Sequence, residues 1–198
     1  MKKSLILIIL VFAFKASNSQ QKLGIKSGMN ISTTKNSIAY PSNKIGWYAG
    51  AFYEQPLGAR SVLHFEILYS QKGDKTDNSL GGPFHRRYFN YLSLPILFGY
   101  KIDPKTKIYL GPEICYLQKV KIFGSNSSDN YPVKIDIGLS VGIGYQIFKN
   151  LGTDIRYIYG FNTFYYVNNS GTRLSDKRGA HRVFQMGLYY DLFNKNQN

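Results

Sequence analysis

The stretch K-I-D-I-G-L-S-V-G-I-G-Y-Q-I, residues 134–147, alternates between two kinds of side chain without exception. Its odd-numbered positions are apolar or aromatic, and its even-numbered positions are small, polar or charged. Successive side chains of a β-strand point to opposite faces, so this segment predicts a strand with one apolar face and one polar, glycine-rich face. Such a strand is typical of a barrel wall that has lipid outside and polar groups inside.

The same alternation recurs in seven more segments of similar length. In each, large apolar and aromatic residues share one phase, and charged residues share the other. Turn-forming residues such as Pro56 with Gly58, and Asp103 with Pro104, separate some of the segments. The sequence therefore predicts an all-β protein with eight strands, at residues 22–32, 45–55, 62–72, 87–102, 107–122, 134–147, 152–162 and 182–193.

The connections between these strands alternate in length. Those at residues 56–61, 103–106 and 148–151 are short. Long polar connections follow the other strands, at residues 33–44, 73–86, 123–133 and 163–181. Short periplasmic turns and long extracellular loops are the pattern of outer-membrane barrels. We therefore expect an eight-stranded antiparallel up-and-down transmembrane β-barrel.

The first residues have the features of an export signal. Lys2 and Lys3 precede an apolar run at residues 5–14, and small or polar residues follow it. The run is too short for a membrane-spanning helix, which needs about 20 residues. We expect a cleaved signal peptide at residues 1–19, a β-barrel domain at residues 20–193 in the cell outer membrane, and a short polar tail at residues 194–198.

Charge and cysteine content limit the partners and the stabilising chemistry. The chain has 25 Lys and Arg residues against 11 Asp and Glu, so its partners should be anionic. For an exported chain, the phosphates of lipopolysaccharide are nearer than nucleic acid, and we expect outer-membrane lipid, lipopolysaccharide and other envelope proteins as partners, not nucleic acid. Cys115 is the only cysteine, which excludes an intramolecular disulfide.

Charged residues in the polar phase of the strands predict the content of the lumen. A carboxylate that faces lipid is costly, whereas carboxylates paired with cations inside a narrow barrel are tolerated. An eight-stranded barrel has an interior that side chains can fill. We therefore expect a salt-bridged plug formed by Lys26, Glu54, Glu66, Lys101, Glu113, Asp136, Asp154 and Arg156.

Many cations fall on the side of the long loops, Lys44 and Lys72 among them. Arginine suits bidentate contacts with phosphate, so these residues could form a collar that binds lipopolysaccharide. The alternative is that they are ordinary solvated charges of exposed loops. The collar residues that we single out are Arg86, Arg87, Lys119, Lys121, Arg178 and Arg182.

The remaining candidate residues do not predict catalysis or a cofactor. His64 falls in the lumen phase, and His85 and His181 fall in the predicted loops. Three dispersed histidines and one cysteine lack the spacing of a zinc site. We expect neither an enzyme nor a bound metal or cofactor. Outward aromatic residues instead predict interfacial girdles, at Trp47, Tyr53, Tyr69, Tyr100, Tyr145, Tyr157 and Tyr159.

Several motifs resemble one known family. They are G-I-K-S-G-M-N at residues 24–30, L-Y-S-Q-K-G at 68–73, Y-L-S-L-P-I-L at 91–97, G-L-S-V-G-I-G-Y at 138–145 and F-Q-M-G-L-Y-Y at 184–190. Together they resemble the PorT-like outer-membrane β-barrel family of Bacteroidetes, a group of porin-family barrels. The resemblance covers essentially the whole mature chain and implies the fold; it does not imply an activity. The chain departs from the usual pattern at its end, where Asn194 to Asn198 follow the last outward residue.

Three functional hypotheses remain open at this point. The first is a plugged barrel with a structural, adhesive or accessory role at the cell surface. The second is a narrow porin-like channel for small solutes. The third is a subunit of an envelope machine, since one member of the resembled family is similar to a component of the type IX secretion system.

Overall fold

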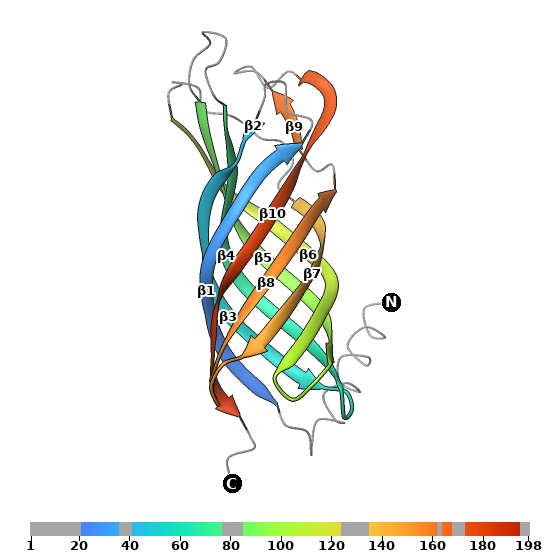
Figure 1. The fold of residues 1–198 in the computed structure, drawn as a ribbon. Helices are drawn as coiled ribbons and strands as arrows, with labels where there is room; N and C mark the ends of the chain where they lie inside the picture. Colours follow the sequence, from blue (N-terminus) through green and yellow to red (C-terminus); the bar gives the residue numbers. More distant parts are fainter. Residues whose placement is uncertain are drawn as a thin grey trace.

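A computed structural model describes residues 21–35, 41–76, 85–123, 135–161, 164–167 and 173–194. Eight long antiparallel strands form a closed barrel (Figure 1), and the predicted signal peptide lies outside the described residues. The strands are β1 (Lys22–Lys35), β3 (Lys44–Pro56), β4 (Ser61–Thr76), β5 (His85–Lys101), β6 (Thr106–Phe123), β7 (Ile135–Gln146), β8 (Leu151–Phe161) and β10 (Arg173–Asn194).

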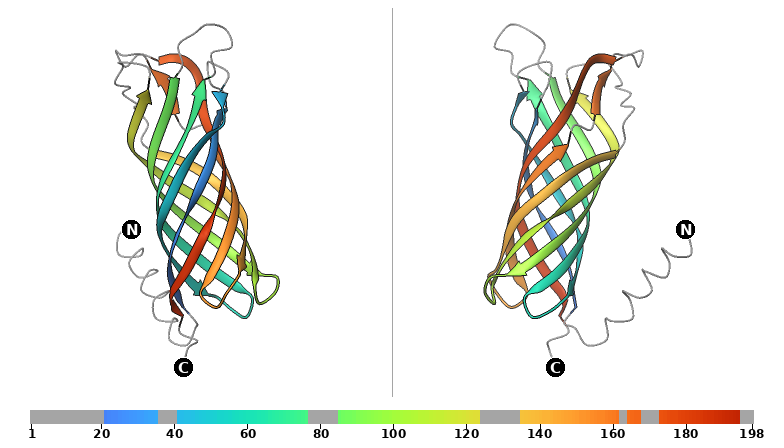
Figure 2. Two further views of the ribbon diagram at one scale, coloured as in Figure 1. Left: turned by 60° about the vertical axis from the view of Figure 1, so that its left-hand side comes forward. Right: turned by 90° about the vertical axis from the view of Figure 1, so that its right-hand side faces the viewer.

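Neighbours in the sequence are neighbours in the barrel, and the first and last strands close it. β1 pairs with β10 from Lys22↔Asn194 to Lys35↔Ala180, while β1 also pairs with β3. Because the barrel is closed, every barrel strand is hydrogen-bonded to a neighbouring strand on each side. The free edges of an open sheet are therefore absent. The three short turns lie together at one end (Figure 2), hereafter the turn end; the opposite end is the loop end. No helix of the described residues is long and apolar enough to cross a membrane.

The alternation of β7 is realised as predicted. Ile135, Leu139 and Val141 are exposed on the outer face, whereas Asp136 and Ser140 are buried inside the barrel. Exposed apolar residues cover the outer faces of the other barrel strands in the same way. Aromatic residues join neighbouring strands there, as where the rings of Trp47 and Tyr69 lie 5.2 Å apart. The barrel thus has charged groups inside and hydrocarbon outside, the reverse of a soluble protein, and this is the arrangement that lipid requires.

The strands extend further into the predicted loops than the sequence indicated. β4 continues to Thr76 instead of ending at residue 72, and β10 begins at Arg173 instead of residue 182. Two short strands that were not predicted, β2 (Pro41–Ser42) and β9 (Phe164–Val167), pair with β4 and β10 at the loop end (Figure 1). Outside the lipid both faces of a strand can be polar, so these extensions lack the alternation that marks a half-buried strand.

Candidate functional site

The lumen near the turn end is centred on Glu66 of β4. Arg156 of β8 binds its carboxylate in a bidentate manner, with Nη1 2.8 Å from Oε2 and Nη2 2.7 Å from Oε1. Lys26 of β1 donates to Oε1 at 3.1 Å. All three side chains are buried. Glu66 thereby links three walls of the barrel through charge-assisted hydrogen bonds, which are stronger than neutral ones.

Asp154 completes this centre. Lys26 Nζ lies 2.6 Å from its Oδ2, and Arg156 Nε lies 2.7 Å from the same atom without the geometry of a hydrogen bond. The hydroxyl of Tyr48 donates to Oδ1 at 3.4 Å. Two cations and two carboxylates thus balance in charge where solvent is excluded. A buried ion that keeps its partners is stable, whereas one that loses a partner is strongly destabilising.

A second layer lies between this centre and the turn end. Lys107 donates to Glu54 Oε2 at 2.6 Å, and the ring of His64 bridges Glu54 at 3.3 Å and Glu66 at 2.7 Å. The rings of Phe52 and Tyr109 lie 5.1 and 5.2 Å from the same ring. The space left among these side chains is about 10 Å³. That volume is at the lower limit of about 10–15 Å³ for a single water molecule. We call these two layers the lower network: Lys26, Glu54, His64, Glu66, Lys107, Asp154 and Arg156.

The lumen toward the loop end holds a separate ion pair. Lys72 Nζ lies 2.8 Å from Glu113 Oε1 and 3.2 Å from Cys115 Sγ. Cys115 also lies 3.0 Å from Glu113 Oε1 and 3.1 Å from Ser93 Oγ. Asp136 is buried on β7, in register with Cys115. Cys115 is therefore a small polar contact of this pair, buried on the lumen side of β6.

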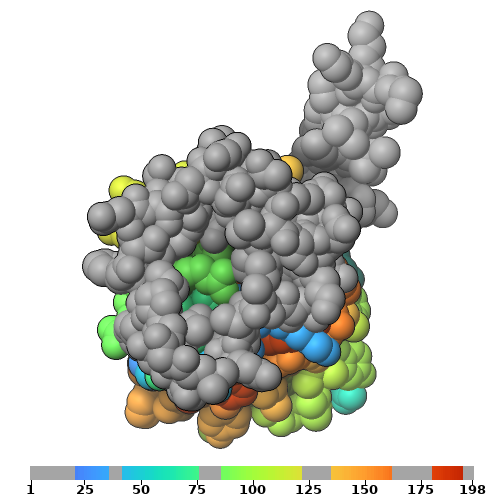
Figure 3. Space-filling view, turned by 90° about the horizontal axis from the view of Figure 1, so that it is seen from above, coloured from blue at the N-terminus to red at the C-terminus, as the bar shows by residue number. Residues whose placement is uncertain are grey.

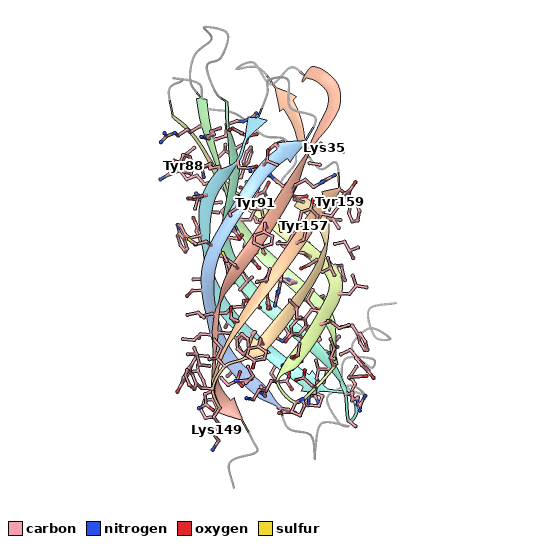
Figure 4. All side chains as sticks on the ribbon, viewed as in Figure 1. Lys35, Tyr88, Tyr91, Lys149, Tyr157 and Tyr159 are labelled. Carbon is pink, nitrogen blue, oxygen red and sulfur yellow. The ribbon has the colours of Figure 1, made fainter. Side chains whose placement is uncertain are left out.

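Aromatic residues fill the lumen beside this pair. Phe89, Tyr91, Cys115 and Leu117 form a buried cluster, and the label of Tyr91 in Figure 4 marks its place in the loop-end half of the barrel. His181 accepts from or donates to the Tyr91 hydroxyl at 3.1 Å, with its ring 5.1 Å from that of Phe89. We call Phe89, Tyr91, Leu117 and His181 the upper cluster. Viewed from above (Figure 3), residues in the green of β5 are visible within this end of the barrel.

Glycines make room for the largest lumen side chains. Gly28 and Gly187 face each other across the β1–β10 pair, and the ring of Tyr48 lies against them. A Cβ at Gly28 would meet the carbonyl of Met186, the Cα of Gly187 and that ring. A side chain at Gly142 would likewise meet Arg156. The close approach of side chains to bare backbone explains glycine in strands, where it is otherwise unfavourable.

The structure separates the eight predicted plug residues into groups. Lys26, Glu54, Glu66, Asp154 and Arg156 meet in the lower network, and Glu113 lies with Asp136 toward the loop end. Lys101 lies at the rim of the turn end and does not enter either group. The prediction omitted His64 and Lys107 from the plug, although both occupy the lumen phase of their strands. Alternation predicts which face of a strand a side chain occupies, but not which side chain on another strand it contacts across the lumen.

Three residues lie where the sequence did not place them. Lys72 and Lys44 were predicted on the loop side among the collar cations, but both are buried inside the barrel. Lys44 Nζ lies 3.4 Å from the ring centre of Tyr88. His181 was predicted in a loop, but it is a buried residue of β10. The placements of Lys44 and His181 in loops were wrong because β3 and β10 extend past the predicted ends, and Lys72, predicted as the last residue of its strand, lies within β4, which continues to Thr76.

Comparison with known proteins agrees with this architecture. Residues 16–166 match the family model described as the outer membrane protein beta-barrel domain. The chain belongs to this family. It is an outer-membrane β-barrel, and its exposed apolar face is therefore the lipid-facing surface. No curated protein matches the sequence.

Solved structures of small outer-membrane barrels are similar to this barrel. Neisserial surface protein A has a TM-score of 0.59 at 13% identity, with 88% of this chain and 100% of that chain covered. Ail, the attachment invasion locus protein of Yersinia pestis, has a TM-score of 0.53 at 13% identity, with the same coverage. OprG from Pseudomonas aeruginosa has a TM-score of 0.51 at 11% identity, covering 90% of this chain and 98% of that chain. At such low identity the likeness establishes the fold alone.

The barrel divides the predicted collar cations. Arg86 of β5 and Lys119 and Lys121 of β6 are exposed on adjacent strands at the loop end. Arg87 instead binds Asp74 with two hydrogen bonds, at 2.7 and 2.6 Å. Arg182 stacks its guanidinium 3.5 Å from the ring centre of Tyr159. The side chain of Arg178 lies outside the described part of the chain.

The described residues also contain no group of three or more His, Cys, Asp and Glu side chains arranged to hold a metal ion. The acids of the lower network instead face Lys26, Lys107 and Arg156. The chemistry of this site is therefore charge pairing across the lumen.

Proposed function

We propose that this barrel is a small outer-membrane surface protein with a closed lumen and a structural, adhesive or accessory role. The observation that carries the proposal is the lower network, where Glu66, held by Arg156 and Lys26, ties opposite walls together. The space of about 10 Å³ among these side chains is too small for a hydrated solute. The function therefore resides at the two ends of the barrel, with the lumen acting as a rigid core.

Conductance across planar bilayers tests the closed lumen. The folded wild-type protein is expected to give no sustained openings. The double variant Glu66→Ala/Arg156→Ala removes the central bidentate pair and should produce measurable openings. Lys149→Gln is the matched control, because Lys149 is an exposed cation of a turn at the same end (Figure 4). Sustained large openings of the wild type would contradict the proposal and favour the narrow porin-like channel.

At the loop end we propose a cationic patch that binds lipopolysaccharide phosphates, formed by Arg86, Lys119 and Lys121. Their positions on two adjacent strands, with exposed side chains, support the proposal. Lysine and arginine supply the point charge and the bidentate geometry that phosphates accept. Arg87 is a weaker candidate because Asp74 already neutralises it.

Co-purification of lipopolysaccharide tests this patch. The triple variant Arg86→Gln/Lys119→Gln/Lys121→Gln should lower the bound lipopolysaccharide several-fold, whereas Arg87→Gln should change it little. An unchanged amount in the triple variant would mean that these residues are only solvated charges. Pull-down in native detergent tests the third hypothesis, in which the barrel is a subunit of an envelope machine. Recovery of the barrel in a stable complex, such as a type IX secretion complex, would favour that hypothesis.

The origin and processing of the chain are part of the same proposal. The strand and turn motifs support a place among the PorT-like barrels of Bacteroidetes. We propose that residues 1–19 are removed on export, so N-terminal sequencing of the mature protein should begin at Gln20. We also propose a non-enzymatic role without a cofactor. It is supported by His64 and His181, whose rings are engaged within the lumen.

A further inference from the structure

The turn end of the barrel contains a cup that is separate from the loop end. It is a cavity of about 580 Å³ between the β3–β4 and β5–β6 turns. Glu54 and Lys107, which are paired with each other at 2.6 Å, belong both to the lining of the cup and to the lower network. The cup is therefore closed by that network and open toward the turns. Its volume falls within the range of about 300–1,000 Å³ that small-molecule sites occupy.

The lining of this turn-end cup is rich in cations. Lys22, Arg60, Lys101, Lys105 and Lys107 line it, against the carboxylates of Glu54 and Asp103. Lys22 is bound by Asp191 at 2.6 Å, and Lys107 is bound by Glu54.

The other three cations are not neutralised in this way. Among the described residues, Arg60, Lys101 and Lys105 have no carboxylate within ion-pair distance. Converging charges of one sign repel each other, and a bound anion would relieve that repulsion.

Asp103 is held by the backbone of its own turn and forms no ion pair with the described cations of the cup. Its Oδ1 accepts hydrogen bonds from the backbone N–H groups of Lys105 at 2.7 Å and Thr106 at 2.8 Å. Hydrogen bonding from Thr106 and Lys105 holds the pKa of the Asp103 carboxyl below its ordinary value. These N–H groups are consequently not available as a backbone nest, the arrangement that often binds phosphate. The cup therefore offers side-chain ammonium and guanidinium groups, which pair with carboxylates as well as with phosphates.

The shape of the cup limits the ligand. Ala59, Ile102 and Pro104 add apolar surface to the lining, so an aliphatic ligand backbone can lie between the cations. The lower network closes the inner end, so a long chain cannot pass through. Short turns of outer-membrane barrels face the periplasm, where the cell wall lies. A compact cell-wall stem peptide, with several carboxylates clustered within a few residues, meets each of these conditions.

We propose that the turn-end cup binds the carboxylates of a peptidoglycan stem peptide through Arg60, Lys101 and Lys105. The proposal is independent of the role of the loop end. It gives the barrel a contact with the cell wall on its periplasmic side. It also assigns a role to Arg60, Lys101 and Lys105, which are not part of the lower network.

Calorimetric titration of the folded mature barrel in detergent tests the proposal. The probe is the tripeptide L-Ala-γ-D-Glu-meso-diaminopimelate at low salt. We expect saturable binding that weakens at least tenfold in Arg60→Gln/Lys101→Gln/Lys105→Gln and is unchanged in Lys149→Gln, a turn cation outside the lining. Lack of saturable binding, or equal loss in both variants, would overturn the proposal.

Two further arms define the ligand. Inorganic phosphate, which offers a single anionic group, should bind at least tenfold more weakly; equal affinity would refute recognition of clustered carboxylates. Intact sacculi should retain the wild-type barrel and release the triple variant. Circular dichroism and heat-dependent gel migration check folding of the variants. If the triple variant does not fold, Lys101→Gln alone decides, with a two- to fivefold weakening expected and an unchanged affinity counting against the proposal.

Discussion

The two halves of the lumen are filled by different chemistry. In the lower network, Lys26 and Arg156 share Glu66 and Asp154, so each ion contacts more than one opposite charge. Toward the loop end, the pairs Lys72–Glu113 and Arg87–Asp74 share no ion with each other, and the aromatic upper cluster lies among the buried residues there. The lower half therefore resembles an ionic lattice, and the upper half resembles the core of a soluble protein with separate embedded ion pairs.

This difference teaches how a narrow barrel can be closed in two ways. Long charged side chains can form ion pairs between strands on opposite sides of the lumen. Each buried ion, however, requires its partners to be present. Aromatic rings fill volume and tolerate the loss of a polar partner, but they require close packing. The two halves should consequently respond to different substitutions, in the order of effect that follows.

The largest effect is expected from Arg156→Met. It leaves Glu66 without its bidentate partner and Asp154 with one cation fewer, both of them buried. Breaking a buried ion pair from one side costs about 3–5 kcal/mol. Urea unfolding of the barrel in lipid vesicles measures the loss of unfolding free energy.

Double variants sharpen the distinction between the halves. Arg156→Met and Lys26→Met act on the same two carboxylates, so their effects should be non-additive by about 0.5–3 kcal/mol. Arg156→Met and Lys72→Met share no ion-pair partner, so their effects should add within about 0.5 kcal/mol. Equal coupling in both pairs would mean that the lumen contains one network.

Phe89→Ala is expected to have the next largest effect. Phe89 is fully buried and contacts Tyr91 and His181 in the upper cluster. Truncation of a buried phenylalanine costs about 3 kcal/mol or more, because a cavity remains. The same urea titration measures it, with the more conservative Phe89→Leu as control. A loss in the leucine variant as large as in the alanine variant would argue against a packing origin.

Gly28→Ala should destabilise the barrel by overpacking. The added methyl group would meet backbone atoms of Met186 and Gly187 as well as the ring of Tyr48. Overpacking of this kind costs about 1–3 kcal/mol. Gly58→Ala is the matched control, because nothing lies within 4 Å of a Cβ built at Gly58 in its exposed turn. Equal stability of the two variants would show that the lumen around Tyr48 can relax.

The smallest effect is expected in the β5–β6 turn, outside both halves of the lumen. The lowered pKa of Asp103 means that its charged form is favoured in the folded state. Its contribution to stability is present above the ordinary pKa of 3.8 and is lost as the pH falls through the lower folded value. Asp103→Asn should therefore lower the urea midpoint slightly at pH 7, and the difference from the wild type should vanish near pH 2. A difference that persists there would assign the effect to hydrogen bonding without charge.

Much of the wall was predictable because lipid imposes a strict rule. Every lipid-facing position of β7 is apolar or aromatic, and Asp136 is buried, as the alternation indicated. The loop-end extensions were not predictable, because beyond the lipid the outer face of a strand can also be polar and no apolar phase marks it. Lys72 shows the consequence: it was predicted as the last residue of its strand and counted among the loop-side cations, but β4 continues to Thr76 and Lys72 is buried in the lumen.

The sequence by itself determined the number of barrel strands, their outward faces and the charged character of the lumen. It could do so because a charged side chain at a lipid-facing position is costly, which keeps the alternation strict. Only the tertiary structure decided which charges meet. Arg156 and Glu66 are 90 residues apart and lie on strands that are not neighbours in the sheet. Their contact depends on strand tilt and register around the closed barrel, which local alternation does not encode. The turn-end cup, formed where separate turns converge, has the same origin.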